Sequence, residues 1–124
     1  MARARRRLSK EEARISDKIF QALYRWTAER KYCVNYPSYD DLARDLDVSR
    51  EQLGWFFSEV LGGKFLAFRK RQRLAYAAFL LRKDATMPAA AVGQKAGIAD
   101  KSDFRRQFAE VFKMSPENWR ASSR

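Results

Sequence analysis

The sequence lacks histidine altogether and has a single cysteine, so the residues on which most enzymes and metal sites depend are missing. Histidine is the commonest general base and metal ligand in proteins. Cys33 has neither a second cysteine nor a histidine to complete a disulfide or a zinc site, and nothing supports it as a nucleophile. We therefore expect a protein that is not an enzyme and that requires no metal or cofactor.

Long hydrophobic runs are also missing. The longest strongly apolar stretch, LAYAAFLL at residues 74–81, is far shorter than the roughly 20 residues of a membrane-spanning helix. The basic start, MARARRRLSK, is followed by no apolar stretch and does not resemble a secretory signal. The sequence therefore indicates a soluble, cytoplasmic protein with no membrane segment.

Acidic residues are outnumbered by basic ones, and their placement is uneven. The net charge is +11 and the pI is near 10.2, which points to a polyanionic partner such as nucleic acid. Residues 37–63 nevertheless carry six acidic and two basic side chains, a net charge of −4, whereas residues 64–85 carry a net charge of +6. An acidic segment thus lies beside a strongly basic one, which a uniformly basic protein would not show.

Apolar residues recur at helical spacing along most of the chain, and no stretch alternates in polarity for long enough to predict a strand. Ser9, Ser38 and Ser49 each precede an acidic or amide residue three positions later, the pattern of a capping box at a helix start. The expected fold is all-α. Helices are expected at about residues 10–30, 38–46, 49–61, 65–82, 88–96 and 101–112, with a last turn at 115–119.

One helical segment occurs twice along the chain. LGWFFSEVLGGKFLAFR (53–69) aligns with FRRQFAEVFKMSPENWR (104–120), and the apolar positions of the two copies correspond. Each copy follows a short helix with a small residue at its bend, which is the helix-turn-helix arrangement. The exposed positions differ, because Gly54 and Trp55 in the first copy correspond to Arg105 and Arg106 in the second.

These features divide the chain into five parts. We expect a basic disordered arm (1–8), an N-terminal helix and connection (9–36), a first helix-turn-helix (37–63), a linker helix (64–85) and a second helix-turn-helix (86–124). The linker helix would span ~27 Å at the rise of an α-helix. That length suits a spacer between recognition helices in successive major grooves, which lie about 34–36 Å apart.

The motifs LARDLDVSREQL, FRKRQRLAYAAFLL and AGIADKSDFRRQFAEVFKMSPENWR resemble the DNA-binding domain of the AraC/XylS family of bacterial transcription regulators. The resemblance covers about residues 37–120. It implies two helix-turn-helix units whose second helices enter successive major-groove segments of double-stranded DNA, and hence a sequence-specific transcription regulator. RNA polymerase is an expected second partner. Family members usually carry a separate sensor or dimerisation domain, and nothing in these residues resembles one.

In the second expected recognition helix, Phe104 and Phe108 belong to the buried stripe, which leaves a polar face open. Arginine can donate two hydrogen bonds to guanine in the major groove, worth ~1–3 kcal/mol of discrimination. Arg106 is the first choice for base reading, whereas phosphate contact stays open for Lys101 and Arg105. The candidate base-reading residues of this helix are Lys101, Ser102, Arg105 and Arg106.

The first expected recognition helix offers Arg50, Glu51, Gly54 and Trp55 as base-reading candidates. Trp55 departs from the family, in which this position is commonly polar or basic. Gly54 costs ~1 kcal/mol relative to alanine inside a helix. Either Gly54 lets the backbone approach DNA and leaves Trp55 to touch thymine methyls, or Trp55 packs against a neighbouring helix or an absent domain. Both interpretations stay open, and the acidic segment 37–63 could also serve contact with RNA polymerase.

Phosphate contacts are expected from helix starts and from the linker helix. Backbone amides and the positive end of the dipole attract phosphate to a helix N-terminus, and RKRQR (69–73) is the densest basic cluster of the folded part. Arg73 is expected to form an intramolecular salt bridge, and residues 118–120 are weaker phosphate candidates. The main candidates are Ser38, Tyr39, Ser49, Arg69, Lys70 and Arg71.

The rival interpretation is a non-catalytic helical adaptor with only non-specific affinity for nucleic acid. Its tryptophans, Trp26, Trp55 and Trp119, would then form core and partner surfaces. Duplex affinity that collapses with salt would separate DNA binding from this interpretation.

Overall fold

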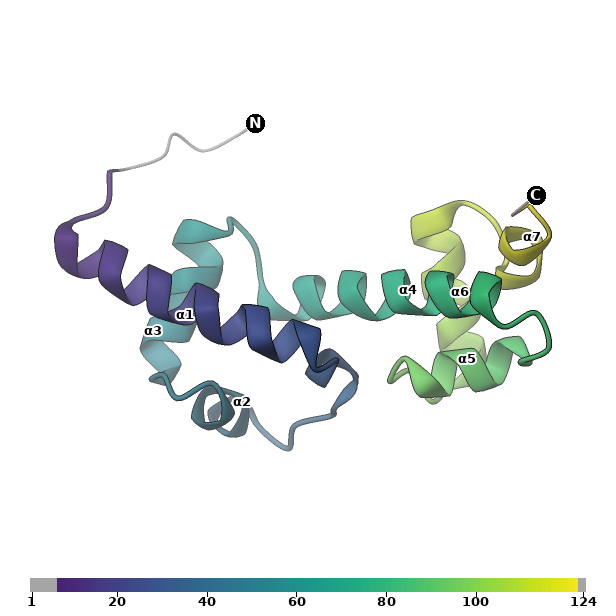
Figure 1. Cartoon of the computed structure of the whole chain (residues 1–124), viewed down its shortest axis with the longest axis horizontal. Helices are drawn as coiled ribbons and strands as arrows, with labels where there is room; N and C mark the ends of the chain where they lie inside the picture. Colours follow the sequence, from purple (N-terminus) through teal and green to yellow (C-terminus); the bar gives the residue numbers. More distant parts are fainter. Residues whose placement is uncertain (1–6, 123–124) are drawn as a thin grey trace. The chain divides into compact units, whose positions relative to one another are not determined.

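The computed structural model describes residues 7–122, and the described chain is entirely helical, as the sequence predicts (Figure 1). Most of the expected basic arm lies outside the described residues. The α-helices are α1 (Lys10–Ala28), α2 (Tyr39–Asp45), α3 (Arg50–Trp55), α4 (Phe65–Lys83), α5 (Ala89–Lys95), α6 (Lys101–Phe112) and α7 (Pro116–Ala121). A 3-10 turn, η1 (Lys31–Cys33), follows α1, and a π-helical turn, η2 (Phe56–Val60), follows α3.

Serine side chains begin the helices where the sequence predicts them. The Ser9 and Ser49 hydroxyls accept hydrogen bonds from the third amide of α1 and α3, and both starts form complete capping boxes. At Ser38 the hydroxyl accepts from the Asp41 amide, while the Asp41 carboxylate accepts from the same hydroxyl. The helix starts are thus fixed by local sequence, which places α2 and α3 on either side of a short turn.

The first of two compact units contains α1 and residues 36–64. Its core includes Ile19 and Trp26 from α1 and Leu53 from α3, each at most 2 % exposed. The Trp26 indole donates to the Tyr36 hydroxyl (2.9 Å), which in turn donates to Asp45 Oδ2 (2.5 Å). Burial, followed by the bond to Asp45, raises the pKa of Tyr36 to about 12. These contacts hold the N-terminal helix against the first helix-turn-helix.

The second unit contains residues 30–35 together with the chain from Phe65 onward. Helix α4 runs through this unit, and α5, α6 and α7 all contact it (Figure 1). The core is fully buried at Leu74, Leu81, Val92, Phe104 and Phe108. The second helix-turn-helix, formed by α5 and α6, is therefore built directly on α4.

The helix expected at about residues 49–61 changes its winding halfway. It is α-helical to Trp55 and π-helical over Phe56–Val60, where the Leu61 amide donates to the Phe56 carbonyl five residues back (3.1 Å). The wider turn brings two consecutive side chains, Phe56 and Phe57, into the core at 1 % and 3 % exposure. In α6 the fully buried phenylalanines, Phe104 and Phe108, lie four residues apart, and no two consecutive side chains are buried. The two copies of the repeated segment therefore differ in backbone as well as in sequence.

Arg73 does not form the salt bridge that the sequence suggests. The residue is 5 % exposed, and its guanidinium donates to the carbonyls of Tyr32 (2.5 Å), Val34 (3.2 Å) and Gly97 (3.0 Å) and to Asn35 Oδ1 (2.9 Å). Burial lowers the pKa of Arg73 to about 10, which leaves the group charged at neutral pH. One buried cation thus fastens the segment that follows α1 and the turn after α5 onto α4.

Gly93 allows α5 and α6 to approach each other closely. A Cβ built at this position would lie 2.7 Å from the Phe104 ring, a separation at which one of the two groups must move. We expect Gly93→Ala to lower the free energy of unfolding by about 1–3 kcal/mol, because overpacking strains a dense core. Thermal unfolding measures the change. Gly63→Ala is the control, since a Cβ there meets nothing within 4 Å, and equal stability of the two variants would contradict the close packing.

Candidate nucleic-acid interface

The outward face of α6 is defined by its two buried phenylalanines. Arg106 lies two residues from both Phe104 and Phe108, so the turn of the helix directs it away from the core. Ser102 lies one turn before Arg106 on the same side, and both residues are exposed. Asp100 caps the helix by accepting from the Asp103 amide (2.7 Å). The structure thus brings Ser102 and Arg106 together on the free side of α6.

Arg106 is held along its own helix by two carboxylates. Its guanidinium donates to Asp103, and its Nη1 lies 3.5 Å from Glu110 Oε1. The arginine side chain is 60 % exposed. Exposed pairs of this kind contribute only about 0–1 kcal/mol. A stronger acceptor can therefore replace these partners without disturbing the fold.

Glu110 also connects α6 to the basic segment of α4. Lys70 Nζ lies 3.4 Å from Glu110 Oε1, the same oxygen that Arg106 approaches. The expected phosphate-contacting residue and the expected base-reading residue therefore share one carboxylate. Lys70 is flanked on α4 by Arg69 and by the exposed Arg71. The Arg69 guanidinium carbon lies 6.0 Å from the Phe65 ring centre.

Arg105 has a different environment from Arg106. Its Nη1 and Nη2 each lie 2.7 Å from one oxygen of the Glu117 carboxylate on α7. This pair raises the pKa of Arg105, and its hydrogen bonds lower the pKa of Glu117. The sequence marks Arg105 as a candidate for base reading or phosphate contact, and it does not reveal the contact with Glu117. The bidentate geometry ties α6 to α7, so Arg105 has a structural partner within its unit.

The candidates on α3 lie around a less basic surface. Arg50 pairs with Asp40 (3.6 Å), and its guanidinium lies 5.9 Å from the Tyr39 ring centre. Glu51 and Gly54 are exposed, whereas Trp55 is half-buried. The structure therefore places the four candidates on one short helix, with the arginine near a carboxylate and the tryptophan partly covered.

The helix starts proposed as phosphate sites use their serines as caps. The Ser38 and Ser49 hydroxyls accept from the amides of Asp41 (3.2 Å) and Gln52 (3.0 Å). The two hydroxyls are therefore engaged, and a phosphate at either start would have to bind the first backbone amides, beginning at Tyr39 and Arg50.

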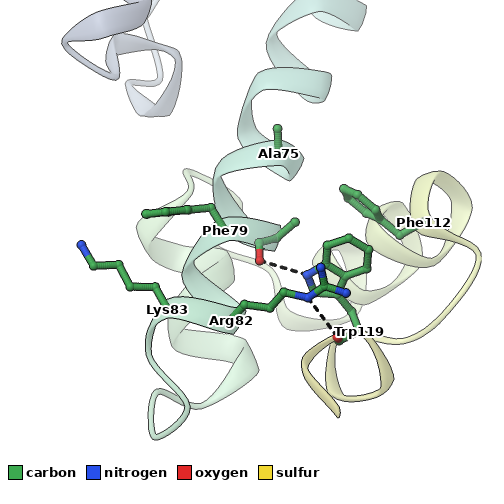
Figure 2. Close-up of a pocket in the computed structure, with 7 residues that line it drawn as sticks. Ala75, Phe79, Arg82, Lys83, Phe112 and Trp119 are labelled. Carbon is green, nitrogen blue, oxygen red and sulfur yellow. Dashed lines mark hydrogen bonds between the residues drawn. The ribbon is translucent and has the colours of Figure 1, made fainter. Parts of the chain in front are cut away.

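A groove of about 580 Å³ opens where α7 meets α4 and the C-terminal end of α6 (Figure 2). Arg82 extends across Trp119, with its guanidinium carbon 3.5 Å from the ring centre, and the Trp119 indole donates to the Ala78 carbonyl (3.0 Å). Cation–π contact and hydrogen bonding therefore fix α7 on α4. The groove lining consists of Ala75, Ala78, Phe79, Arg82, Lys83, Phe112 and Trp119.

Arg120, within the segment proposed as a weaker phosphate site, is engaged inside the second unit. Its guanidinium donates to the carbonyls of Leu81 (2.7 Å), Asp84 (3.1 Å) and Met87 (2.6 Å). These carbonyls lie at and beyond the C-terminal end of α4, where no further helical amides are available to donate to them. Arg120 therefore closes the end of α4, a role that its place in the sequence does not reveal.

Comparison with known families agrees with this architecture. A family model described as a helix-turn-helix domain matches residues 42–122, about two thirds of the chain. The fold and the match define a DNA-binding protein of the helix-turn-helix class, a transcription regulator. More specifically, the chain belongs to the AraC-type helix-turn-helix family, a family of DNA-binding domains and not of enzymes.

Several solved structures share the fold, and three of them illustrate it. A protein of unknown function from Listeria innocua is 24 % identical, with a TM-score of 0.68 over 83 % of this chain and 95 % of that one. The C-terminal domain of the response regulator yesN from Fusobacterium nucleatum is 20 % identical, with a TM-score of 0.62 over 90 % and 99 %. The C-terminal domain of AraT, a response regulator from Geobacillus stearothermophilus, is 21 % identical, with a TM-score of 0.65 over 94 % and 88 %. None of the curated proteins matches the chain.

Within residues 7–122, no helix combines the length and apolar character needed to cross a membrane. The same residues contain no group of three or more cysteine, aspartate or glutamate side chains placed to hold a metal ion.

Proposed function

We propose that this chain binds double-stranded DNA sequence-specifically, with α3 and α6 as recognition helices that enter successive major-groove segments. The observation that carries the proposal is the outward face of α6, where Ser102 and Arg106 project opposite two buried phenylalanines. In helix-turn-helix proteins the second helix of the motif lies in the major groove, and its N-terminal residues contact base edges. Ser102 and Arg106 lie in the first half of α6.

Arg106 supplies the chemistry of base reading. A guanidinium can donate two bonds to O6 and N7 of guanine. In the free protein Asp103 and Glu110 occupy these donors, and guanine would take their place in the complex. Lys70, whose ammonium is a point charge beside Glu110, would instead contact the phosphate backbone.

Arg106→Ala and Lys70→Ala are therefore expected to act differently. Arg106→Ala should reduce the preference for one base pair by ~1–3 kcal/mol, because the bidentate contact is lost. Lys70→Ala should weaken all duplexes alike and lower the slope of log K against log salt by about 1. Titration of each variant with the preferred duplex and with single-base variants measures both effects. Uniform loss of affinity in both variants would contradict the assignment of Arg106 as a reader.

The remaining partners belong to the same proposal. Two of the similar structures are C-terminal domains of response regulators, which supports a regulatory domain as a partner of this DNA-binding domain. The acidic segment 37–63 has a net charge of −4, and its carboxylates would repel phosphate. We assign the acidic surface of this segment to contact with RNA polymerase.

Selection of binding sites from a random duplex library at near-physiological salt tests the proposal. Two enriched blocks about one helical turn apart are the expected result. A single block that depends on Arg106 would restrict base reading to α6. No enrichment would overturn the proposal and favour the helical adaptor with only non-specific affinity for nucleic acid.

A further inference from the structure

Gly54 has no explanation within the fold. A Cβ at Gly93 would strike a phenylalanine ring at 2.7 Å, and Gly62 and Gly97 have φ values of +70° and +96°, which favour glycine. At Gly54 an added Cβ meets nothing within 4 Å, and the residue lies inside α3. Glycine is among the least favourable residues in a helix. The missing side chain is therefore unfavourable for the folded chain and serves no packing need of that chain.

The second copy of the repeat shows what this position can hold. Arg105, the counterpart of Gly54, reaches across to Glu117 on α7 with two contacts of 2.7 Å. Among the described residues of the first unit, no helix takes the place of α7, because η2 leads through Gly62 and Gly63 toward α4. The flank of α3 at Gly54 is consequently open to solvent, and any good helix former would fit there.

The side chains beside Gly54 project little from this face of α3 and leave little unpaired positive charge on it. Trp55, the counterpart of Arg106, is half-buried, so only part of this residue is accessible to a partner. Arg50 is paired with Asp40 at 3.6 Å, and Glu51 is negatively charged. At the positions equivalent to Arg105 and Arg106, α3 therefore has no arginine that could contact guanine as proposed for α6.

We propose that α3 reads thymine methyl groups at close range, with its backbone brought against the bases at Gly54 and the exposed part of Trp55 contacting the methyl. Thymine is the base that presents an apolar group in the major groove, and apolar side chains contact it there. A Cβ at position 54 would stand between the helix backbone and the DNA. This inference rests on the proposed function, because it specifies how the first of the two recognition helices reads its site.

Gly54→Ala separates binding from folding. The variant is expected to raise Tm by about 2–5 °C, because alanine favours the helix and nothing in the chain opposes its Cβ. Its affinity for the selected duplex should nevertheless fall at least about tenfold, since one methyl group displaces the helix from the bases. Gly63→Ala is the matched control: its Cβ is equally unobstructed, and its affinity should remain within about twofold of the parent.

Deoxyuridine tests the ligand side of the same contact. Replacing thymidine by deoxyuridine in the block read by α3 removes the methyl group and keeps the base pairing. The parent chain should lose about tenfold in affinity on this replacement. Gly54→Ala, already weakened, should lose little further affinity, because the two changes remove the same interaction. Unchanged affinity of Gly54→Ala for a two-block site, or equal binding of thymine and deoxyuridine, would overturn this inference alone. Failure of the parent chain to select any sequence would overturn the proposed function as well.

Discussion

Binding to duplex DNA is expected to weaken about 10³–10⁵-fold when the salt concentration rises from 50 to 200 mM, the loss typical of roughly 6–10 phosphate contacts. Each contacted phosphate releases condensed counterions, and added salt opposes that release. The net charge of +11 and the basic segment 64–85 supply the cations. Fluorescence titration of a labelled duplex at five or six salt concentrations gives the slope, which should be about −0.9 for each phosphate neutralised.

Variants of α4 show which cations contribute to that slope. Arg69, Lys70 and Arg71 lie consecutively on α4, and Lys70 approaches Glu110 of the recognition helix. Replacing Arg71 by alanine should reduce the slope by about 1, as for Lys70. Arg120 donates to three carbonyls of its own unit, so we expect no phosphate contact from it. A slope near zero for the parent chain would contradict DNA binding of either kind, because specific and non-specific binding both depend on phosphate contacts.

Local sequence predicts the helices of this protein well because their ends are fixed by neighbouring residues. Ser9 and Ser49 form reciprocal caps with residues three positions away, and α6 runs over Lys101–Phe112 as expected. The duplication is also visible in the sequence, since the spacing of apolar residues is repeated. The face of α6 follows from the same spacing, and Arg106 projects from it.

The features that the sequence does not predict depend on residues far apart in the chain. The contacts of Arg73 with residues 32–35, of Trp119 with Ala78 and of Arg120 with Leu81 span about 40 positions each. Cations in a basic sequence are expected to face solvent, so nothing local distinguishes Arg120 from its neighbours. For Arg73 the sequence suggests an acidic partner, whereas the acceptors are backbone carbonyls and the Asn35 amide oxygen. The π-turn at Phe56–Val60 is equally hidden, because its apolar residues also fit an α-helix.

Arg73→Met is expected to lower the free energy of unfolding by about 2–4 kcal/mol and Tm by roughly 10 °C or more. Methionine fills similar space and forms helices as well as arginine does. It cannot donate, however, so four oxygen acceptors on residues 32, 34, 35 and 97 would lose their shared partner. Arg71→Met is the matched control, because Arg71 lies on the same helix and is exposed; we expect a change within about 0.5 kcal/mol.

Cys33 gives a local measure of the same contact. This half-buried thiol lies in η1, between Tyr32 and Val34, and burial raises its pKa. If Arg73 holds residues 32–35 on α4, its loss should expose Cys33 and bring the pKa of the thiol back toward its ordinary value. Alkylation at pH 8 should then be several-fold faster in Arg73→Met than in Arg71→Met, because the thiolate is the reactive form. Alkylation no faster in Arg73→Met than in Arg71→Met, together with equal Tm values, would show that the segment stays in place, because loss of the Arg73 charge alone raises the pKa of the thiol.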